Sequence, residues 1–169
     1  MSRAPFQLAP LDAAHERAGF DSDSEPLNRY LREQVAQDIR RRVAACFVAL
    51  ADGPCIAGYY TLASASLRLA DLPASTDKKL PRYPTVPAVR MGRLAVDRAF
   101  KGHGLGGALL ADALSRAAHA KIAAFALVVD AKDGAAAAFY RHHDFIALPD
   151  SPLTLFLPLA TVHHWPGFL

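Results

Sequence analysis

The stretch Arg93–Leu110, RLAVDRAFKGHGLGGALL, places four glycines between a short apolar run and a helical one. The apolar run ends a predicted strand, Val89–Val96, and the second half begins a predicted helix near Gly104. Glycines lack Cβ atoms, so a ligand can approach the backbone, and successive N–H groups can point into one concavity beside the positive end of the helix dipole. The stretch therefore predicts a pyrophosphate-binding loop, with Arg98 and Lys101 supplying positive charge at its rim.

Other kinds of glycine-rich turn have to be weighed against this interpretation. Gly102–Gly107 matches the G-x-G-x-x-G pattern of dinucleotide-binding folds, and Asp130 follows the next predicted strand, where such folds place a ribose-binding acid. However, Asp97–Lys101 separates the strand from the first glycine, and fewer than forty residues follow Asp130, too few for the rest of a doubly wound sheet. A Walker-type loop fails because no Gly-Lys-Ser/Thr follows. A turn that binds nothing would need only one or two glycines.

The rest of the chain predicts a mixed α/β (α+β) architecture. Apolar residues recur with a helical period from Leu27 to about Arg42, and two runs of β-forming residues, Ala44–Leu50 and Ile56–Ala65, flank a Gly-Pro turn as a hairpin. After a proline-punctuated segment, the expected elements are strand Val89–Val96, helix Gly104 to about His119, strand Ala123–Val129, helix Asp133–His142 and strand Leu153–Leu157. An antiparallel start followed by β-α-β-α-β predicts a mixed sheet.

Composition predicts the class of protein. With 169 residues, 52% of them hydrophobic, the chain has the size of one domain, 1–169. No stretch resembles a signal-peptide core or a membrane-spanning helix, which predicts a cytoplasmic protein. The seven histidines show no zinc-like spacing, so no metal is expected. Cys46 and Cys55 flank the hairpin turn out of register with each other, which predicts two buried free thiols.

Positive charge is concentrated in one segment of the chain. Residues 77–101 hold seven cations and two acids, whereas the formal net charge of the whole chain is only +3. The segment is also rich in proline and leads directly into the glycine loop. It predicts either a solvated basic loop or a surface that faces a polyanion.

Several motifs resemble a known family. Gly102-x-Gly104-x-Gly106 after Leu94–Val96, followed by a helix, an apolar strand and Ala138-Phe139-Tyr140 before Phe145, resembles the acetyl-CoA site of the GNAT (Gcn5-related) N-acetyltransferases. Over about residues 20 to 146 the chain also resembles the GNAT toxins of bacterial toxin–antitoxin modules, through Phe20-Asp21 with Leu27-Asn28-x-x-Leu31, Gly58–Leu62, Leu80–Ala88, Gly92–Asp97 and Val129–Asp133.

Three positions depart from the pattern of the family. Lys101 stands where Gln or Arg is usual, and Asp133 stands where many relatives outside the toxins have Asn. Asp144 stands where Gly normally precedes the Phe. Because Asp tolerates a positive φ less well than Gly, Asp144 predicts a changed last turn.

The resemblance implies a fold and a set of site residues. The fold is the GNAT fold, a mixed central sheet with helices on both faces and a splayed strand pair that holds acetyl-CoA. Main-chain groups of the splayed strand would bond the pantetheine and the acetyl carbonyl. Tyr140 matches the general acid that protonates the departing thiolate. The residues implied to bind acetyl-CoA are Leu94, Ala95, Val96, Arg98, Lys101, Gly102, His103, Gly104, Leu105, Gly106, Gly107, Asp133 and Phe139.

The resemblance also implies a substrate and partners. These toxins acetylate the α-amine of aminoacyl-tRNA, which blocks translation, are held in check by a ribbon-helix-helix antitoxin and are commonly homodimers. No carboxylate in the sequence stands out as a general base, which favours an α-amine of pKa about 7.7–8.0 over a lysine side chain at about 10.4. The cations expected to bind the tRNA backbone are Arg40, Arg41, Arg42, Lys78, Lys79, Arg82, Arg90 and Arg93.

Two alternative functions stay open at this point. A GNAT enzyme could instead acetylate a small amine or a protein N-terminus. In another class, a nucleotide-binding regulatory module would use the glycine loop without chemistry. A basic surface distinguishes the tRNA enzyme from the first alternative, and turnover of acetyl-CoA distinguishes both enzymes from the second.

Overall fold

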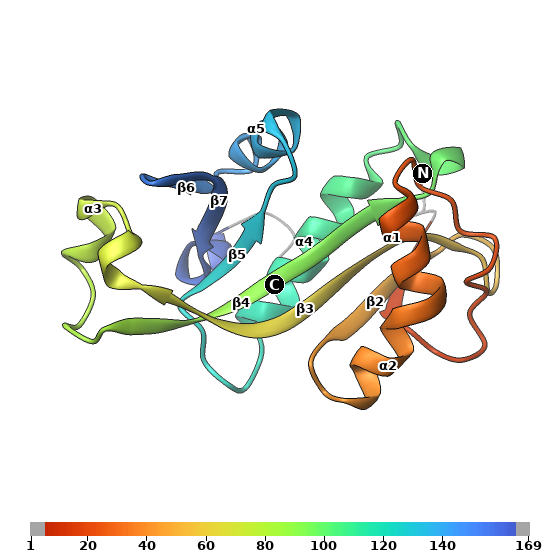
Figure 1. Ribbon diagram of the computed structural model, residues 1–169, viewed down its shortest axis with the longest axis horizontal. Helices are drawn as coiled ribbons and strands as arrows, with labels where there is room; N and C mark the ends of the chain where they lie inside the picture. The colour runs from red at the N-terminus through yellow and green to blue at the C-terminus, as the bar shows by residue number, and fades with distance from the viewer. Residues whose placement is uncertain (1–5, 165–169) are drawn as a thin grey trace. The chain divides into compact units, whose positions relative to one another are not determined.

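The computed structural model describes residues 6–164 of the chain. Its strands form a seven-stranded mixed sheet in the order β1-β2-β3-β4-β5-β7-β6 (Figure 1). The chain divides into two compact units. The first unit comprises the described residues up to Ala63 together with Gly92–Ala113, and the second comprises Ser64–Met91 and the described residues from Leu114 onward.

The elements follow the expected order with several additions. The strands are β1 (Gln7–Pro10), β2 (Ala45–Leu50), β3 (Ile56–Arg68), β4 (Thr85–Val96), β5 (Ala126–Asp130), β6 (Ile146–Leu148) and β7 (Ser151–Pro158). The α-helices are α1 (Glu25–Arg29), α2 (Val35–Arg40), α3 (Ala74–Asp77), α4 (Leu105–Ala118) and α5 (Gly134–His142). A π-helical turn, Tyr30–Gln34, joins α1 to α2, and short 3-10 turns cover Leu69–Asp71, Arg98–Phe100 and Leu159–His164.

The first unit is built on an antiparallel β1-β2-β3 ladder. Cys46 pairs with Thr61, and Leu50 pairs with Ile56 after a bulge. Along β3 the side chains alternate between two faces. A Cβ on Gly58 would lie 2.8 Å from the Leu109 side chain of α4, while the adjacent Tyr59 is fully buried and stacks on Tyr30 of the π-helical turn. Helices therefore cover both faces of this ladder.

The apolar core of the first unit lies between the ladder and the N-terminal helical segment. Figure 1 shows α1 and α2 following one another beside β2. The segment begins at Ser24, whose side chain accepts a hydrogen bond of 3.4 Å from the backbone N–H of Leu27. The buried residues of this core are Phe20, Tyr30, Leu31, Val35, Cys46, Val48, Leu50, Ile56, Tyr59 and Ala95.

The second unit contains the parallel part of the sheet. β5 pairs in parallel with β4 from Ala88–Ala126 to Met91–Val129, and antiparallel with β7. β5 is fully buried from Ala126 to Val129, as its unbroken apolar run predicts for a central strand. The core of this unit consists of Leu67, Leu69, Leu72, Val86, Ala88, Ala126, Val128, Leu148 and Phe156.

The expected mixed α/β architecture is confirmed, but the expected burial of both cysteines is wrong for Cys55. Cys46 is buried, whereas Cys55 is exposed and sits at the turn of the β2–β3 hairpin. Both thiols are free, as expected. The exposure follows from the register, because the backbone of Cys55 pairs with Ala51 beyond the end of the ladder. None of the helices in the described part of the chain is long and apolar enough to cross a membrane.

Candidate functional site

The glycine loop of the first unit has a backbone that two of its glycines make possible. Gly102 has φ +84° and Gly104 has φ +75°, values that L residues rarely adopt. No described atom lies within 4 Å of the place where a Cβ of either glycine would be, so the loop is open to solvent. α4 starts directly after Gly104, and the N–H groups of its first turn have no intrahelical acceptor. These donors can bind an anion.

Asp97 fixes the start of this loop, a role that the sequence analysis missed. Its backbone N–H donates to the carbonyl of Ala57 on β3 at 2.8 Å. Its carboxylate accepts hydrogen bonds from the N–H groups of Ala99 and Asp21, each at 2.9 Å. The backbone N–H of Arg98 in turn donates to the carbonyl of Asp21 at 2.9 Å. The loop is therefore tied both to the sheet and to the segment that precedes α1.

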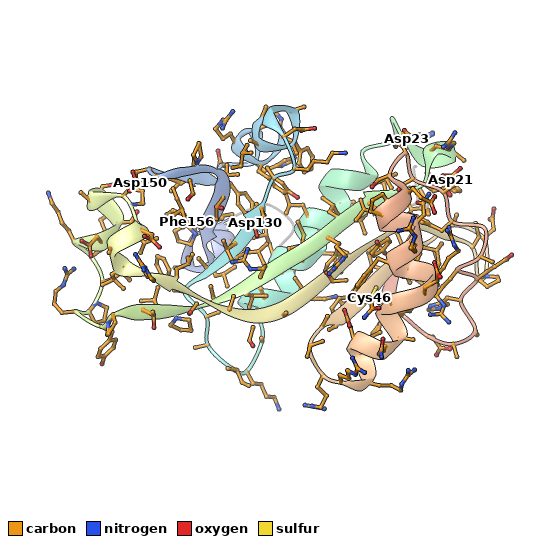
Figure 2. The ribbon with its side chains drawn as sticks, in the orientation of Figure 1. Asp21, Asp23, Cys46, Asp130, Asp150 and Phe156 are labelled. Atoms are coloured by element: carbon orange, nitrogen blue, oxygen red, sulfur yellow. The ribbon has the colours of Figure 1, made fainter. Side chains whose placement is uncertain are left out.

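That segment is held by a buried asparagine. Asn28 is 4% exposed, accepts hydrogen bonds from the backbone N–H and the hydroxyl of Ser22, both at 2.8 Å, and donates to Asp21 Oδ1 at 3.0 Å. Figure 2 shows Asp21 and Asp23 together on the loop before α1. The motif Phe20-Asp21 with Leu27-Asn28 thus has a clear structural role: it anchors α1 next to the glycine loop.

The two cations at the rim of the loop already have acidic partners. Arg98 Nε lies 3.1 Å from Asp21 Oδ2, and Arg98 Nη2 lies 3.4 Å from Asp23 Oδ1. The Lys101 ammonium forms an ion pair with Asp23 as well. All four side chains are largely exposed, so the pairs can exchange with other charged groups. An anion that binds this loop would compete with Asp21 and Asp23 for its cations.

Tyr140 lies on α5 in the second unit. Asp133 caps this helix by accepting a hydrogen bond from the backbone N–H of Ala136 at 2.9 Å. Tyr140 is 8% exposed and packs against the rings of Phe139 and Phe145, whose centres are 5.2 Å and 5.6 Å away. Burial, with a smaller contribution from the charge of Asp130, raises the pKa of Tyr140 to about 12. The hydroxyl is therefore protonated at neutral pH, and it makes no hydrogen bond within residues 6–164.

The expected cofactor residues are thus distributed over the two units. The first unit brings together the strand end Leu94–Val96, the cations Arg98 and Lys101, and the loop Gly102–Gly107. The second unit holds Asp133, Phe139 and Tyr140 on and before α5.

The cations expected to bind tRNA differ in how far the protein itself uses them. Arg93 lies over the ring of Tyr30, Arg82 pairs with Asp77 at 3.2 Å, and Arg90 pairs with Asp130. The others form no ion pair with any residue that the structure describes; they are Arg40, Arg41, Arg42, Lys78 and Lys79, and all of them are exposed.

Comparison with known families identifies the class of protein. The model of the acetyltransferase (GNAT) family matches residues 11–145, so the chain belongs to this family and is an acyltransferase that uses acetyl-CoA.

Within this family, the chain is similar to toxins that acetylate tRNA. A tRNA-acetylating toxin of Mycobacterium tuberculosis is 38% identical over 156 residues, which cover 91% of this chain and 90% of the toxin. The structure of AtaT complexed with acetyl-methionyl-tRNAfMet is 29% identical, with a TM-score of 0.87 over 94% of this chain and 98% of AtaT. A tyrosine-to-phenylalanine mutant of the AtaT toxin, bound to the C-terminus of the antitoxin AtaR and to acetyl-CoA, is 25% identical, with a TM-score of 0.80 over 95% of this chain and 98% of that chain.

Proposed function

We propose that this protein transfers an acetyl group from acetyl-CoA to the α-amine of aminoacyl-tRNA, and that it acts as a translation-blocking toxin in the cytoplasm. The observation that carries the proposal is the 38% identity to a tRNA-acetylating toxin over nearly the whole of both chains. The matched region includes every residue considered for the site.

The glycine loop is the proposed binding site of the pyrophosphate of acetyl-CoA. Its open backbone and the free N–H groups at the start of α4 fit an anionic group, and Arg98 and Lys101 supply full charges. The main chain of Leu94–Val96 would hold the pantetheine and the acetyl carbonyl. Asp133 and Phe139 complete the proposed set in the second unit.

The chemistry requires one proton donor from the protein. The amine nitrogen bonds to the acetyl carbon, the bond from that carbon to sulfur breaks, and the Tyr140 hydroxyl gives its proton to the thiolate. The nitrogen releases its own extra proton to solvent, from which Tyr140 is reprotonated. A phenol with a pKa of about 12 is present in its acid form throughout the neutral range, as this role requires.

The proposed partners follow from the substrate and from the relatives. Aminoacyl-tRNA is a polyanion, and the exposed cations offer contacts to its backbone, Lys78 and Lys79 in the second unit and Arg40–Arg42 in the first. A ribbon-helix-helix antitoxin is the proposed inhibitor, and a homodimer is the proposed assembly.

A side-by-side assay with radiolabelled acetyl-CoA tests the function. We expect the purified protein to acetylate aminoacyl-tRNA in preference to polyamines and to peptides. A preference for either of the latter would replace the tRNA enzyme with a general amine acetyltransferase. In the same assay, Lys78→Glu with Lys79→Glu should weaken acetylation of aminoacyl-tRNA about tenfold or more and leave acetyl-CoA binding intact. Arg82 is kept in this variant because it pairs with Asp77.

The cofactor site has its own test. Gly104→Val should abolish acetyl-CoA binding by calorimetry while circular dichroism shows the fold intact, because φ +75° is strained for valine and the backbone of the loop would have to change its conformation. Gly19→Val is the matched control, since no described atom lies within 4 Å of its Cβ position and its φ is not positive. Unchanged affinity of Gly104→Val would contradict the pyrophosphate site.

A further inference from the structure

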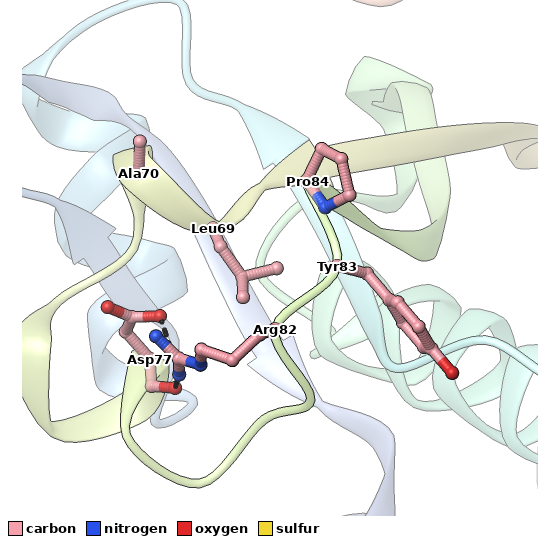
Figure 3. A pocket seen from close by; sticks show the side chains of 6 residues that line it. All are labelled: Leu69, Ala70, Asp77, Arg82, Tyr83 and Pro84. Carbon is pink, nitrogen blue, oxygen red and sulfur yellow. Dashed lines mark hydrogen bonds and ion pairs between the residues drawn. The ribbon is translucent and has the colours of Figure 1, made fainter.

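A hollow of about 400 Å³ lies in the second unit, in the proline-punctuated segment (Figure 3). The residues that line it are Leu69, Ala70, Asp77, Arg82, Tyr83 and Pro84. Its volume falls within the range of pockets that hold small organic groups. Leu69 forms an apolar floor, whereas Arg82 and Asp77 form a charged side.

The loop beside this hollow is held in one shape by its own hydrogen bonds. Arg82 Nη2 donates to the carbonyls of Asp77 and Leu80 and lies 3.2 Å from Asp77 Oδ1. The backbone N–H of Tyr83 donates to the carbonyl of Pro81 at 2.8 Å. The carbonyl of Pro84 accepts a hydrogen bond from the N–H of the buried Leu69 at 3.1 Å. Pro81 and Pro84 restrict the backbone of this loop further.

This internal bonding gives Arg82 a structural task. Figure 3 shows its side chain reaching Asp77, while the Tyr83 ring extends the other way. Lys78 and Lys79 are exposed and form no ion pair with any described residue. The loop therefore presents two ammonium groups and one aromatic ring.

The exposure of Tyr83 is unusual for its type. Tyr83 is 66% exposed, and among the large hydrophobic residues that are exposed in the described part of the chain it is the one aromatic. A ring that is two-thirds exposed contributes little packing to the fold, and a ring held by a hydrogen-bonded loop loses little entropy when it binds a flat partner. Aromatic rings next to cations are the usual platform for unpaired nucleobases.

We propose that Tyr83 stacks on an unpaired nucleobase of the tRNA, with Lys78 and Lys79 binding neighbouring phosphates and Arg82 holding the loop in shape. This inference rests on the proposed function and assigns part of its substrate site. Nucleic acid fits better than a protein partner because residues 64–91 carry five cations and only two acids. Stacking contributes about 1–3 kcal/mol per base, equivalent to about 5- to 150-fold in affinity.

The first test compares substitutions that keep or remove the ring. Tyr83→Ala should raise the KM for aminoacyl-tRNA about tenfold, with kcat at saturating tRNA and the Kd for acetyl-CoA unchanged. Tyr83→Phe should behave like the parent, because stacking needs the ring and not the hydroxyl. Ile122→Ala is the matched control, since Ile122 is an exposed apolar residue of the same unit, 87% exposed, that also lies next to a lysine, Lys121, but has no aromatic ring.

The second test detects the contact directly. In a Tyr83→Trp variant that also carries Trp165→Phe, a short single-stranded oligoribonucleotide should quench the emission of the new indole, and a duplex RNA of the same length should quench it much less. Absence of quenching, or an unchanged KM for Tyr83→Ala, would overturn the stacking proposal.

The outcomes separate this proposal from the function on which it rests. If the parent does not acetylate aminoacyl-tRNA at all, the proposed function fails. If the parent does so and Tyr83→Ala is equally active, only the stacking site fails. Loss of antitoxin binding by Tyr83→Ala with a normal KM for tRNA would reassign the surface to a protein partner and overturn the proposal.

Discussion

The guanidinium carbon of Arg93 lies 3.5 Å from the centre of the Tyr30 ring, and the Tyr30 hydroxyl donates a hydrogen bond of 2.7 Å to Asp38. Burial and the hydrogen bond to Asp38 raise the pKa of Tyr30 well above its usual range. Arg93 therefore joins the end of β4 to the π-helical turn, although the sequence suggested a contact with tRNA. Because the guanidinium of Arg93 lies over a buried ring, we expect Arg93 to contribute to the stability of the fold.

Replacing Arg93 by methionine tests this contribution. Arg93→Met keeps an apolar stem of similar length and removes the charge over the ring, so the free energy of unfolding should fall by about 0.5–2 kcal/mol. Chemical denaturation measures the change. Arg29→Met, at an exposed position of α1, is the control and should be neutral. Equal stability of the two variants would show that the stacked cation contributes nothing to the fold.

The ion pair between Asp23 and Lys101 predicts an effect on cofactor affinity. Asp23→Asn removes a carboxylate that competes with the cofactor's phosphates for Lys101 and Arg98, so acetyl-CoA should bind about two- to fivefold more tightly at low salt. The gain should shrink as salt is added, because exposed charges are screened. Calorimetry at two ionic strengths measures both effects, with Asp52→Asn as an exposed acid in the β2–β3 turn for comparison. Weaker binding would mean instead that Asp23 orients the two cations.

The raised pKa of Tyr140 predicts a pH profile. Because this pKa is about 12, the acid form, which donates the proton, predominates up to pH 10, so the donor sets no alkaline limit in that range. Activity should therefore rise through about pH 8, where the α-amine of the substrate loses its proton, and then stay level to about pH 10. A fall in kcat/KM between pH 8 and 10, with the protein still folded, would argue against this donor.

Removal of the Tyr140 hydroxyl should separate binding from chemistry. Tyr140→Phe should lower kcat by about 10²- to 10⁴-fold, the usual contribution of a positioned acid, and leave the Kd for acetyl-CoA unchanged. Tyr140 packs among aromatic rings, and phenylalanine fills the same space, so the fold should persist. Turnover at the rate of the parent would make Tyr140 a packing residue only.

The backbone conformation of Asp144 suits glycine better than aspartate, so a substitution by glycine should stabilise the protein. Asp144 has φ 72° and lies two residues after the end of α5. This conformation costs an L residue about 1–2 kcal/mol, and less for Asp than for most residues. Asp144→Gly should therefore raise the free energy of unfolding by about 0.5–1 kcal/mol, with a higher Tm. Asp150→Gly is the control, because Asp150 does not have a positive φ and glycine should only add flexibility there. A lower Tm for Asp144→Gly would mean that the Asp side chain itself stabilises the turn.

Local patterns of sequence predicted the elements around the site well. The strand, loop and helix in Arg93–Leu110 were predicted because apolar runs and glycines specify them without help from distant residues. The long helix from Leu27 was predicted too, but not the π-helical turn inside it, where the N–H of Val35 donates to the carbonyl of Tyr30. The helix propensities of residues 30–34 do not indicate the extra residue of a π-helical turn. In the structure, the turn occurs where Tyr30 packs against Tyr59, a contact between distant residues.

Contacts between distant residues could not be predicted in the same way. Asp23 and Lys101 are 78 positions apart, and Arg90 and Asp130 are 40 apart. A surplus of cations in the sequence was therefore interpreted as a free surface, although folding gives several of them acidic partners. The short elements β1, α3 and β6 were missed because three or four residues carry too little periodicity.

The different surroundings of the two cysteines make the natural sequence suitable for attachment of a probe. Burial raises the pKa of the Cys46 thiol to about 12, so it is neither accessible nor ionised at neutral pH. Cys55 is exposed at the hairpin turn. A maleimide dye should therefore label the folded protein at one position without any engineered residue, and a single fluorophore on that turn could report the binding of tRNA or antitoxin as a change in anisotropy.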